Sequence, residues 1–226
     1  MIASAFHPAP NGEPGRALLV MLPGIGMAAD EFAAHGFVSA VHDRRLPIDI
    51  VAIQPELDLY LEGKIAGALH DTVISPAMAR GYRRLWLLGI SVGGMGALLY
   101  AAARLASVDG LVLLAPFLGT PGTLAEVSAA GGITAWPPEN TRATTVERKM
   151  LLWLRSFLAR SPTRPALYLG YGRDDRFARG HDLLAQHLPQ QQVVVGGGGH
   201  DWATWTSLWL RILNGQPFAA EIGDER

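Results

Sequence analysis

Six short apolar runs, spread along the chain, limit how this sequence can fold more than any other feature. Each run is almost continuously apolar and lacks the alternation with polar residues that marks a half-exposed strand. Such runs are typical of strands in a parallel sheet that is buried on both faces. The runs are Ala17–Leu22, Ile48–Ile53, Leu85–Ile90, Gly110–Ala115, Ala166–Tyr171 and Gln192–Val195.

The segments between the apolar runs show the residue spacing of helices. Because strands and helices alternate, we expect right-handed βαβ units and a fold of the α/β class. The expected architecture is a three-layer α/β/α sandwich around a mostly parallel sheet of about six strands. The expected helices are Ala28–Arg44, Leu61–Arg80, Val92–Leu105, Thr145–Arg160, Phe177–Leu188 and Trp202–Leu213.

The chain has 226 residues, no internal repeat and no linker-like stretch, which predicts one domain over residues 1–226. Residues 117–163 interrupt the alternation, because this stretch is too long for an ordinary strand-to-helix connection. It contains Gly-, Pro- and Thr-rich sequence and one expected helix around Val146–Leu158. One interpretation is a small cap or insertion at the ligand-binding edge of the sheet. The other is a surface loop followed by a helix that covers one sheet face.

Charge and composition exclude several classes of protein. The 19 Lys and Arg residues against 20 Asp and Glu give a net charge of −1, so we expect no nucleic-acid or membrane partner. The absence of cysteine excludes disulfides, thiolate metal sites and a cysteine nucleophile. The histidines show no metal-binding spacing, so we expect no metal. There is no signal-peptide pattern and no apolar stretch of the ~20 residues of a membrane span, which predicts a soluble, cytoplasmic protein.

The segment Gly89-Ile-Ser-Val-Gly93 has the G-x-S-x-G pattern of a nucleophile elbow. About 0.1 such matches would arise from this composition by chance, so the context of the motif matters. The apolar run Leu85–Leu88 precedes it and the helix-like segment Met95–Ala102 follows, as in the strand–turn–helix setting of an elbow. We therefore expect Ser91 at the tip of a strained turn, between small neighbours that let strand and helix approach.

Candidates for a base and an acid also follow predicted strands. His200 comes after the last predicted strand and a run of four glycines. Asp174 and Asp175 come directly after the fifth predicted strand, and either carboxylate could orient a histidine. With Ser91, these residues have the chain order Ser…Asp…His that is found in α/β-hydrolases.

The turn Pro23-Gly-Ile-Gly-Met27 follows the first predicted strand. As part of an oxyanion hole, it would offer the backbone N–H of Ile25 or Gly26, next to that of Val92. Continued to Ala29, the same segment also has the G-x-G-x-x-A spacing of a dinucleotide-binding fingerprint. The acidic residue that this fingerprint requires is missing from the end of the second predicted strand, and the nearest one comes about ten positions late.

Two segments carry a resemblance to a known family: Gly89-Ile-Ser-Val-Gly-Gly-Met-Gly-Ala97 and Gly198-Gly-His-Asp-Trp-Ala-Thr-Trp205. They resemble the serine and histidine motifs of the esterase D-like group in the α/β-hydrolase superfamily. The resemblance implies hydrolysis of carboxylic esters or thioesters without a metal or an organic cofactor. The chain departs from the wider pattern at Pro23, where many hydrolases have a histidine.

The motifs and the resemblance together predict a serine esterase with five site residues. Ser91 would attack the ester carbonyl, His200 would act as the base, and Asp175 would hold the histidine tautomer. The backbone N–H groups of Ile25 and Val92 would form the oxyanion hole.

The resemblance favours Asp175 over Asp174. In similar hydrolases the acid comes three residues after the glycine that ends its strand, and Gly172 places that position at Asp175. The expected partner is a small-molecule ester, and a neutral chain with an apolar insertion favours an uncharged one. The alternatives are a thioesterase, a lipase-like hydrolase, a non-catalytic binding domain of the same fold, or a dinucleotide-dependent oxidoreductase.

Overall fold

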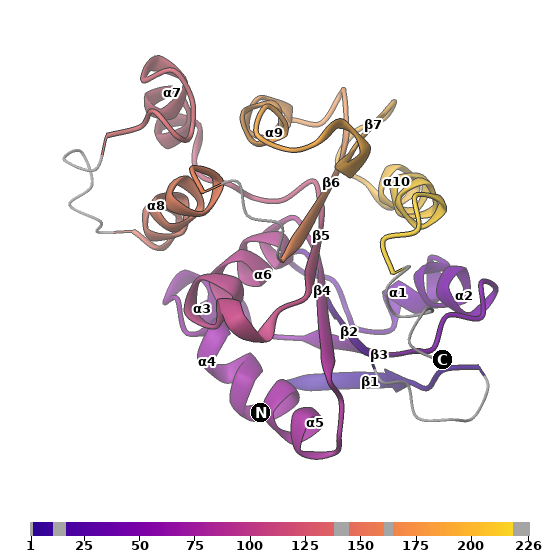
Figure 1. Cartoon of the computed structure of the whole chain (residues 1–226). Helices are drawn as coiled ribbons and strands as arrows, with labels where there is room; N and C mark the ends of the chain where they lie inside the picture. The colour runs from indigo at the N-terminus through magenta and orange to yellow at the C-terminus, as the bar shows by residue number, and fades with distance from the viewer. Residues whose placement is uncertain (1, 11–16, 138–144, 161–164, 219–226) are drawn as a thin grey trace.

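The structure is a computed structural model that describes residues 2–10, 17–137, 145–160 and 165–218. Within these residues, seven strands form one sheet in the order β1-β3-β2-β4-β5-β6-β7 (Figure 1). Neighbouring strands are parallel except β1, which pairs antiparallel with β3 at one edge. The strands are β1 (Ala3–His7), β2 (Ala17–Leu22), β3 (Ile48–Gln54), β4 (Arg84–Ile90), β5 (Gly110–Leu114), β6 (Ala166–Gly172) and β7 (Val193–Gly196).

The predicted α/β architecture with a mostly parallel sheet is confirmed. Each of the predicted strands matches an observed one to within one residue at either end. The additional strand is β1, and none of its residues is buried. An edge strand of this kind pairs through its backbone and needs no continuous apolar run, so the pattern that revealed the other strands is absent from it.

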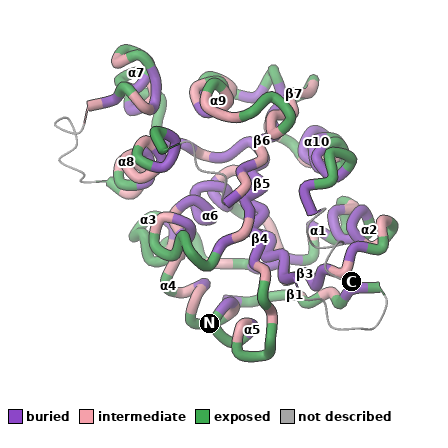
Figure 2. Tube along the Cα trace, in the orientation of Figure 1, coloured by how far each residue is buried: buried purple, intermediate pink, exposed green. Residues whose placement is uncertain are grey.

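Helices cover both faces of the sheet. The core on one face is formed with α1, α2 and α10, and the core on the other with α3 to α9. Figure 2 shows the buried residues in the sheet and on the helix sides that face it. The helices are α1 (Glu31–Ala34), α2 (Phe37–His42), α3 (Leu57–Leu61), α4 (Ile65–Leu69), α5 (Ser75–Ala79), α6 (Val92–Ala103), α7 (Pro121–Ala129), α8 (Val146–Leu158), α9 (Ala178–Ala185) and α10 (Trp202–Asn214).

Two predicted helices are wrong as single elements. The first, Ala28–Arg44, is divided into α1 and α2 because Gly36 between them has a φ of 80°. The second, Leu61–Arg80, is interrupted after α3 at Gly63, which has a φ of 69°, and a π-helical turn joins α4 to α5. A glycine in the left-handed region ends a helix, and apolar spacing alone does not reveal it.

The stretch 117–163 contains α7 in addition to the predicted α8. The sequence does signal α7, since the Thr120 side chain accepts a hydrogen bond from the Thr123 N–H and Pro121 occupies the first helical turn. Helix α8 buries Met150 and Leu154 in the core on one sheet face, whereas α7 lies beside α9 (Figure 1). Residues 138–144 and 161–163 of this stretch lie outside the described residues. In the described ranges, no helix combines the length and apolar character that a membrane crossing requires.

Candidate active site

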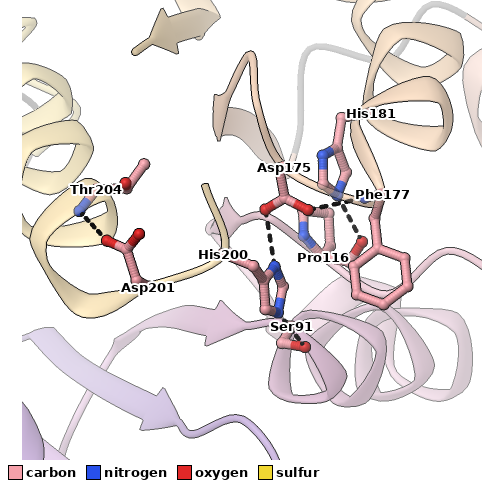
Figure 3. Close-up of polar contacts among 8 residues, drawn as sticks. All are labelled: Ser91, Pro116, Asp175, Phe177, His181, His200, Asp201 and Thr204. Atoms are coloured by element: carbon pink, nitrogen blue, oxygen red, sulfur yellow. Dashed lines mark hydrogen bonds and ion pairs between the residues drawn. The ribbon is translucent and has the colours of Figure 1, made fainter. Parts of the chain in front are cut away.

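Three polar residues singled out in the sequence meet at the carboxyl edge of the sheet. Ser91 follows β4, Asp175 follows β6, and His200 follows β7 after the glycine run. The carboxyl ends of parallel strands lie at one edge, so loops that are far apart in the sequence come together there (Figure 3). The structure thus brings Ser91, Asp175 and His200 into direct contact.

Ser91 occupies a strained turn between β4 and α6. Its φ is 54° and its ψ is −118°, a conformation that costs a non-glycine residue about 1–3 kcal/mol. Four backbone hydrogen bonds hold it. The Ser91 N–H donates to Leu114 O at 3.0 Å, and the Ser91 carbonyl oxygen accepts from the N–H groups of Gly94 at 3.0 Å, Met95 at 3.4 Å and Phe117 at 2.8 Å. The serine hydroxyl is therefore presented from a backbone whose position is fixed on several sides.

The two glycines of the elbow allow this close approach. A Cβ on Gly89 would collide with the carbonyl oxygen of Gly93, which is in the first turn of α6. A Cβ on Gly93 would collide with the carbonyl oxygen of Leu22, at the end of β2. Small residues are thus required by packing at both positions, which is the physical reason for the G-x-S-x-G spacing.

A hydrogen-bonded relay joins the three side chains. His200 Nε2 lies 2.9 Å from Ser91 Oγ, and His200 Nδ1 lies 2.7 Å from Asp175 Oδ2. A carboxylate only accepts, so Nδ1 carries the proton and the lone pair of Nε2 faces the serine hydroxyl. The Asp175 side chain is 0% exposed and that of His200 is 13% exposed, so the relay is shielded up to the serine. Such an arrangement can remove a proton from Ser91 and return it to another atom.

Asp175, and not Asp174, contacts the histidine. Burial by itself would raise the pKa of the Asp175 carboxyl, but the hydrogen bonds from His200 and from the Phe177 N–H outweigh it and lower this pKa below its ordinary value. The Phe177 N–H donates to Asp175 Oδ1 at 2.8 Å, which leaves Oδ2 for the imidazole. The Asp174 side chain accepts from the Gly198 N–H at 3.3 Å and belongs to an exposed residue.

The predicted oxyanion residues lie on two segments that approach Ser91. Val92 is the first residue of α6, and its N–H precedes the internal bonds of the helix. The turn that contains Ile25 passes close to the serine, since a Cβ built on Gly24 would lie 3.5 Å from Ser91 Cβ. Neither the Ile25 nor the Val92 N–H donates to an acceptor in the described part of the chain. Both groups are available to a substrate oxygen.

The turn after β2 does not have the arrangement of a dinucleotide-binding loop. In that loop the last glycine opens a helix whose N-terminus binds the pyrophosphate. Here Gly26 is followed by further irregular residues, and α1 begins at Glu31 and has only four residues. Among the described residues, no group of three or more His, Asp or Glu side chains could hold a metal ion.

His181 is a neighbour of the site that the sequence did not single out. It lies on α9 and is fully buried, and its Nε2 donates to the carbonyl oxygen of Pro116 at 3.0 Å (Figure 3). Burial lowers the pKa of His181 below its ordinary value, more than the nearby Asp175 carboxylate raises it. Pro116 precedes Phe117, whose N–H donates to the Ser91 carbonyl oxygen. The hydrogen bond of His181 therefore helps to fix the segment that holds the Ser91 backbone. Its spacing in the sequence carries no signal of this contact.

Aromatic rings border the imidazole on two sides. The ring centroid of Phe177 lies 5.1 Å from that of His200, and the centroid of Trp205 lies 5.0 Å from it, both edge-on. After His200, Asp201 is the N-cap of α10, where its Oδ1 accepts from the Thr204 N–H at 2.9 Å. The cap fixes the chain directly after the histidine.

Comparison with known proteins gives matches among solved structures only. No family model and no curated protein matches the sequence. The chain is similar to an S-formylglutathione hydrolase from Staphylococcus aureus, with 16% identity, 91% of this chain and 82% of that chain covered, and a TM-score of 0.63. It is similar to a thermophilic esterase from Thermogutta terrifontis, with 13% identity, coverage of 97% and 94%, and a TM-score of 0.61.

A monoacylglycerol lipase from Paleococcus ferrophilus also matches, with 14% identity, 96% of this chain and 98% of that chain covered, and a TM-score of 0.58. All three of these proteins are hydrolases by name, and each likeness extends over nine-tenths or more of this chain. The sheet order, the elbow and the similar structures define one class: the chain has the α/β-hydrolase fold. This is the fold that the sequence motifs predicted.

Proposed function

We propose that this protein is a serine hydrolase that cleaves carboxylic esters through an acyl-enzyme. The relay from Ser91 Oγ to His200 Nε2, at 2.9 Å, and from His200 Nδ1 to Asp175 Oδ2, at 2.7 Å, carries the proposal. The three side chains have the contacts and the chain order that this chemistry requires. The proposal adds a reaction to the fold, since a fold alone does not imply an activity.

In the first half of the reaction, His200 Nε2 takes the hydroxyl proton while Ser91 Oγ bonds to the ester carbonyl carbon. The carbonyl oxygen becomes an oxyanion that receives hydrogen bonds from the Ile25 and Val92 N–H groups. The carbon–oxygen bond to the alcohol then breaks, and His200 gives its proton to the leaving oxygen. The acyl group remains on Ser91.

In the second half, His200 removes a proton from water, and the hydroxide formed attacks the acyl carbonyl carbon. A second oxyanion forms at the same two N–H groups, the bond to Ser91 Oγ breaks, and the serine regains its proton from His200. Asp175 stays ionised throughout, because its lowered pKa keeps the carboxylate available to the imidazolium that forms in each step.

Experiments on this protein can distinguish three alternative functions from the proposed one. The similar structures include proteins named for a thioester, an ester and a monoacylglycerol substrate, so a thioesterase or a lipase-like hydrolase would use the same relay. A non-catalytic binding domain would keep the fold and lack the nucleophile's reactivity.

Labelling by a fluorophosphonate probe tests the nucleophile directly. We expect the wild type to be labelled at Ser91 and Ser91→Ala to escape labelling. Ser207→Ala, a change on the exposed side of α10, should be labelled as the wild type is.

Ser91→Ala should also lower the turnover of para-nitrophenyl esters about 10⁴–10⁶-fold, with unchanged circular dichroism. Retention of a tenth of the wild-type turnover would contradict the proposal. Short-chain and long-chain esters and acyl thioesters then separate esterase, lipase-like and thioesterase activity.

A further inference from the structure

A cavity of about 290 Å³ lies beside the proposed site, between α7 and α9. Phe177 forms part of its wall, and the same ring packs edge-on against His200 (Figure 3). Apolar side chains of the two helices, Leu124 and Leu183, form other parts of the lining. Phe177 is thus the residue that the cavity shares with the surroundings of the imidazole.

The chemistry of the proposed reaction assigns this cavity to the leaving group. The carbonyl oxygen must reach the N–H groups of Ile25 and Val92, and both residues line a different cavity of about 250 Å³. The leaving oxygen must instead reach His200 Nε2, because it takes the proton there. Of the two rings that pack against that imidazole, Phe177 lines the cavity between α7 and α9, so this cavity is the candidate for the leaving group and the one at Ile25 is the candidate for the acyl group.

The cavity has an excess of positive charge. Arg176 and Arg179 line it, and neither forms an ion pair with a described residue. The guanidinium carbon of Arg176 lies 4.9 Å from the centroid of the Phe177 ring, so its charge is held next to the ring that contacts the imidazole. Asp182 also lines the cavity, and its Oδ1 accepts from the Tyr171 hydroxyl at 2.6 Å. The lining therefore contains two cations and one anion, and the anion already accepts a hydrogen bond.

We propose that this cavity binds the leaving-group part of the substrate and that this part carries an anionic group such as a carboxylate. Arg176 and Arg179 bind the anion, while Phe177 and Leu124 pack against the hydrocarbon that joins it to the scissile bond. The proposal rests on the proposed esterase function. The neutral total charge of the chain favoured an uncharged ester, but it averages over this local pair of arginines.

Two esters of one acid test the subsite. Para-carboxyphenyl butyrate and para-carbamoylphenyl butyrate have the same acyl group and leaving groups of nearly the same shape, and only the first is anionic. The measured quantity is the ratio of kcat/KM for the anionic ester to that for the neutral ester. Each ratio is compared between variants, so the different intrinsic reactivities of the two esters cancel.

We expect Arg176→Gln and Arg179→Gln each to lower this ratio about two- to fivefold, mainly through kcat/KM of the anionic ester. Asp182→Asn keeps an acceptor for Tyr171 and removes the negative charge, so it should raise the ratio. Arg173→Gln is the matched control, because it removes one exposed arginine from the same loop and does not line the cavity. Added salt should lower the wild-type ratio and leave that of the double variant almost unchanged.

The outcomes separate the subsite from the function. If the double variant Arg176→Gln/Arg179→Gln keeps the wild-type ratio, or if Arg173→Gln lowers the ratio as much as the cavity variants do, the subsite is refuted while the esterase stands. If the wild type hydrolyses neither ester and Ser91 is not labelled by the fluorophosphonate, the proposed function fails and the subsite fails with it.

Discussion

The two sides of the proposed site differ in how strongly burial and hydrogen bonds fix their residues. On the elbow side, the Ser91 backbone is bonded to Leu114, Gly94 and Phe117, and the Asp175 side chain behind the imidazole is fully buried. On the side of the cavity between α7 and α9, Arg176 and Arg179 are exposed, and neither forms an ion pair with a described residue. The two sides are joined at Phe177, which contacts the imidazole and lines the cavity.

The difference teaches how one site can separate reactivity from selectivity. Proton transfer and bond formation depend on positions held to fractions of an ångström, which buried backbone contacts supply. Selection among leaving groups can depend on weak, exposed charges, which a chain can alter without disturbing the elbow. We therefore expect changes on the elbow side to lower the turnover of every ester, and changes on the cavity side to alter the preference between esters.

Among changes that leave the nucleophile in place, the largest effect is expected from the buried carboxylate. Asp175→Asn should lower kcat by up to about 10⁴-fold for neutral and anionic esters alike, because an amide in place of the carboxylate favours the wrong histidine tautomer. Asp174→Asn is the matched control and should change kcat less than about tenfold. Similar effects of the two variants would mean that the acid has been misassigned.

A smaller effect is expected at the oxyanion turn. Ile25→Pro removes one backbone N–H and should lower kcat about 10²–10³-fold, the cost of one oxyanion donor. Ile25→Ala keeps the N–H and shortens an exposed side chain, so it should retain most of the activity. If alanine costs as much as proline, the side chain and not the N–H matters, and the assignment of this group is wrong.

An effect on stability is expected from His181. Its helix lines the cavity, and its imidazole contacts the Pro116 carbonyl oxygen next to the elbow. His181→Leu leaves the buried Pro116 carbonyl without its donor and should lower the free energy of unfolding by about 1–3 kcal/mol more than His181→Gln, which can donate from a similar position. A leucine variant that is as stable as the glutamine variant would show that this hydrogen bond is not needed.

The pH dependence of His181 gives a second readout. Its pKa is lowered in the folded protein from an ordinary value of 6.5, so the unfolded chain binds the proton first as the pH falls. The stability of the wild type should therefore decrease from neutral pH to about pH 5, and His181→Gln should lose part of this decrease. Urea unfolding of both proteins at the two pH values measures the difference.

The sequence predicts the strands well because a strand buried on both faces must be apolar throughout. It also predicts the positions of Ser91, Asp175 and His200 at one edge, since each follows one of the predicted strands, His200 after the glycine run. It does not predict the breaks at Gly36 and Gly63, because the apolar spacing of a helix continues across a left-handed glycine.

Contacts between distant segments are harder to predict than the position of a residue in the strand order. Nothing in the spacing of His181 shows that its imidazole reaches Pro116, which is 65 positions earlier in the chain. Arg176 and Arg179 likewise look like ordinary exposed charges in the sequence. Only the position of α7 beside them shows that they line a cavity. Such features depend on how loops meet, and the pattern of apolar residues specifies the sheet more closely than it specifies its loops.

The order of the strands has a consequence for when activity can arise. From β4 to β7 the strands are added to the sheet in chain order, and His200 lies 109 positions after Ser91. A chain made only as far as Phe117 can contain the elbow and the contacts that hold it, but it has no base to activate the serine. In the proposed reaction, the serine of a chain that folds from its N-terminus during synthesis therefore stays inert until β7 and α10 have docked. The first turnover of an ester by refolding protein would accordingly mark the end of folding and not its beginning.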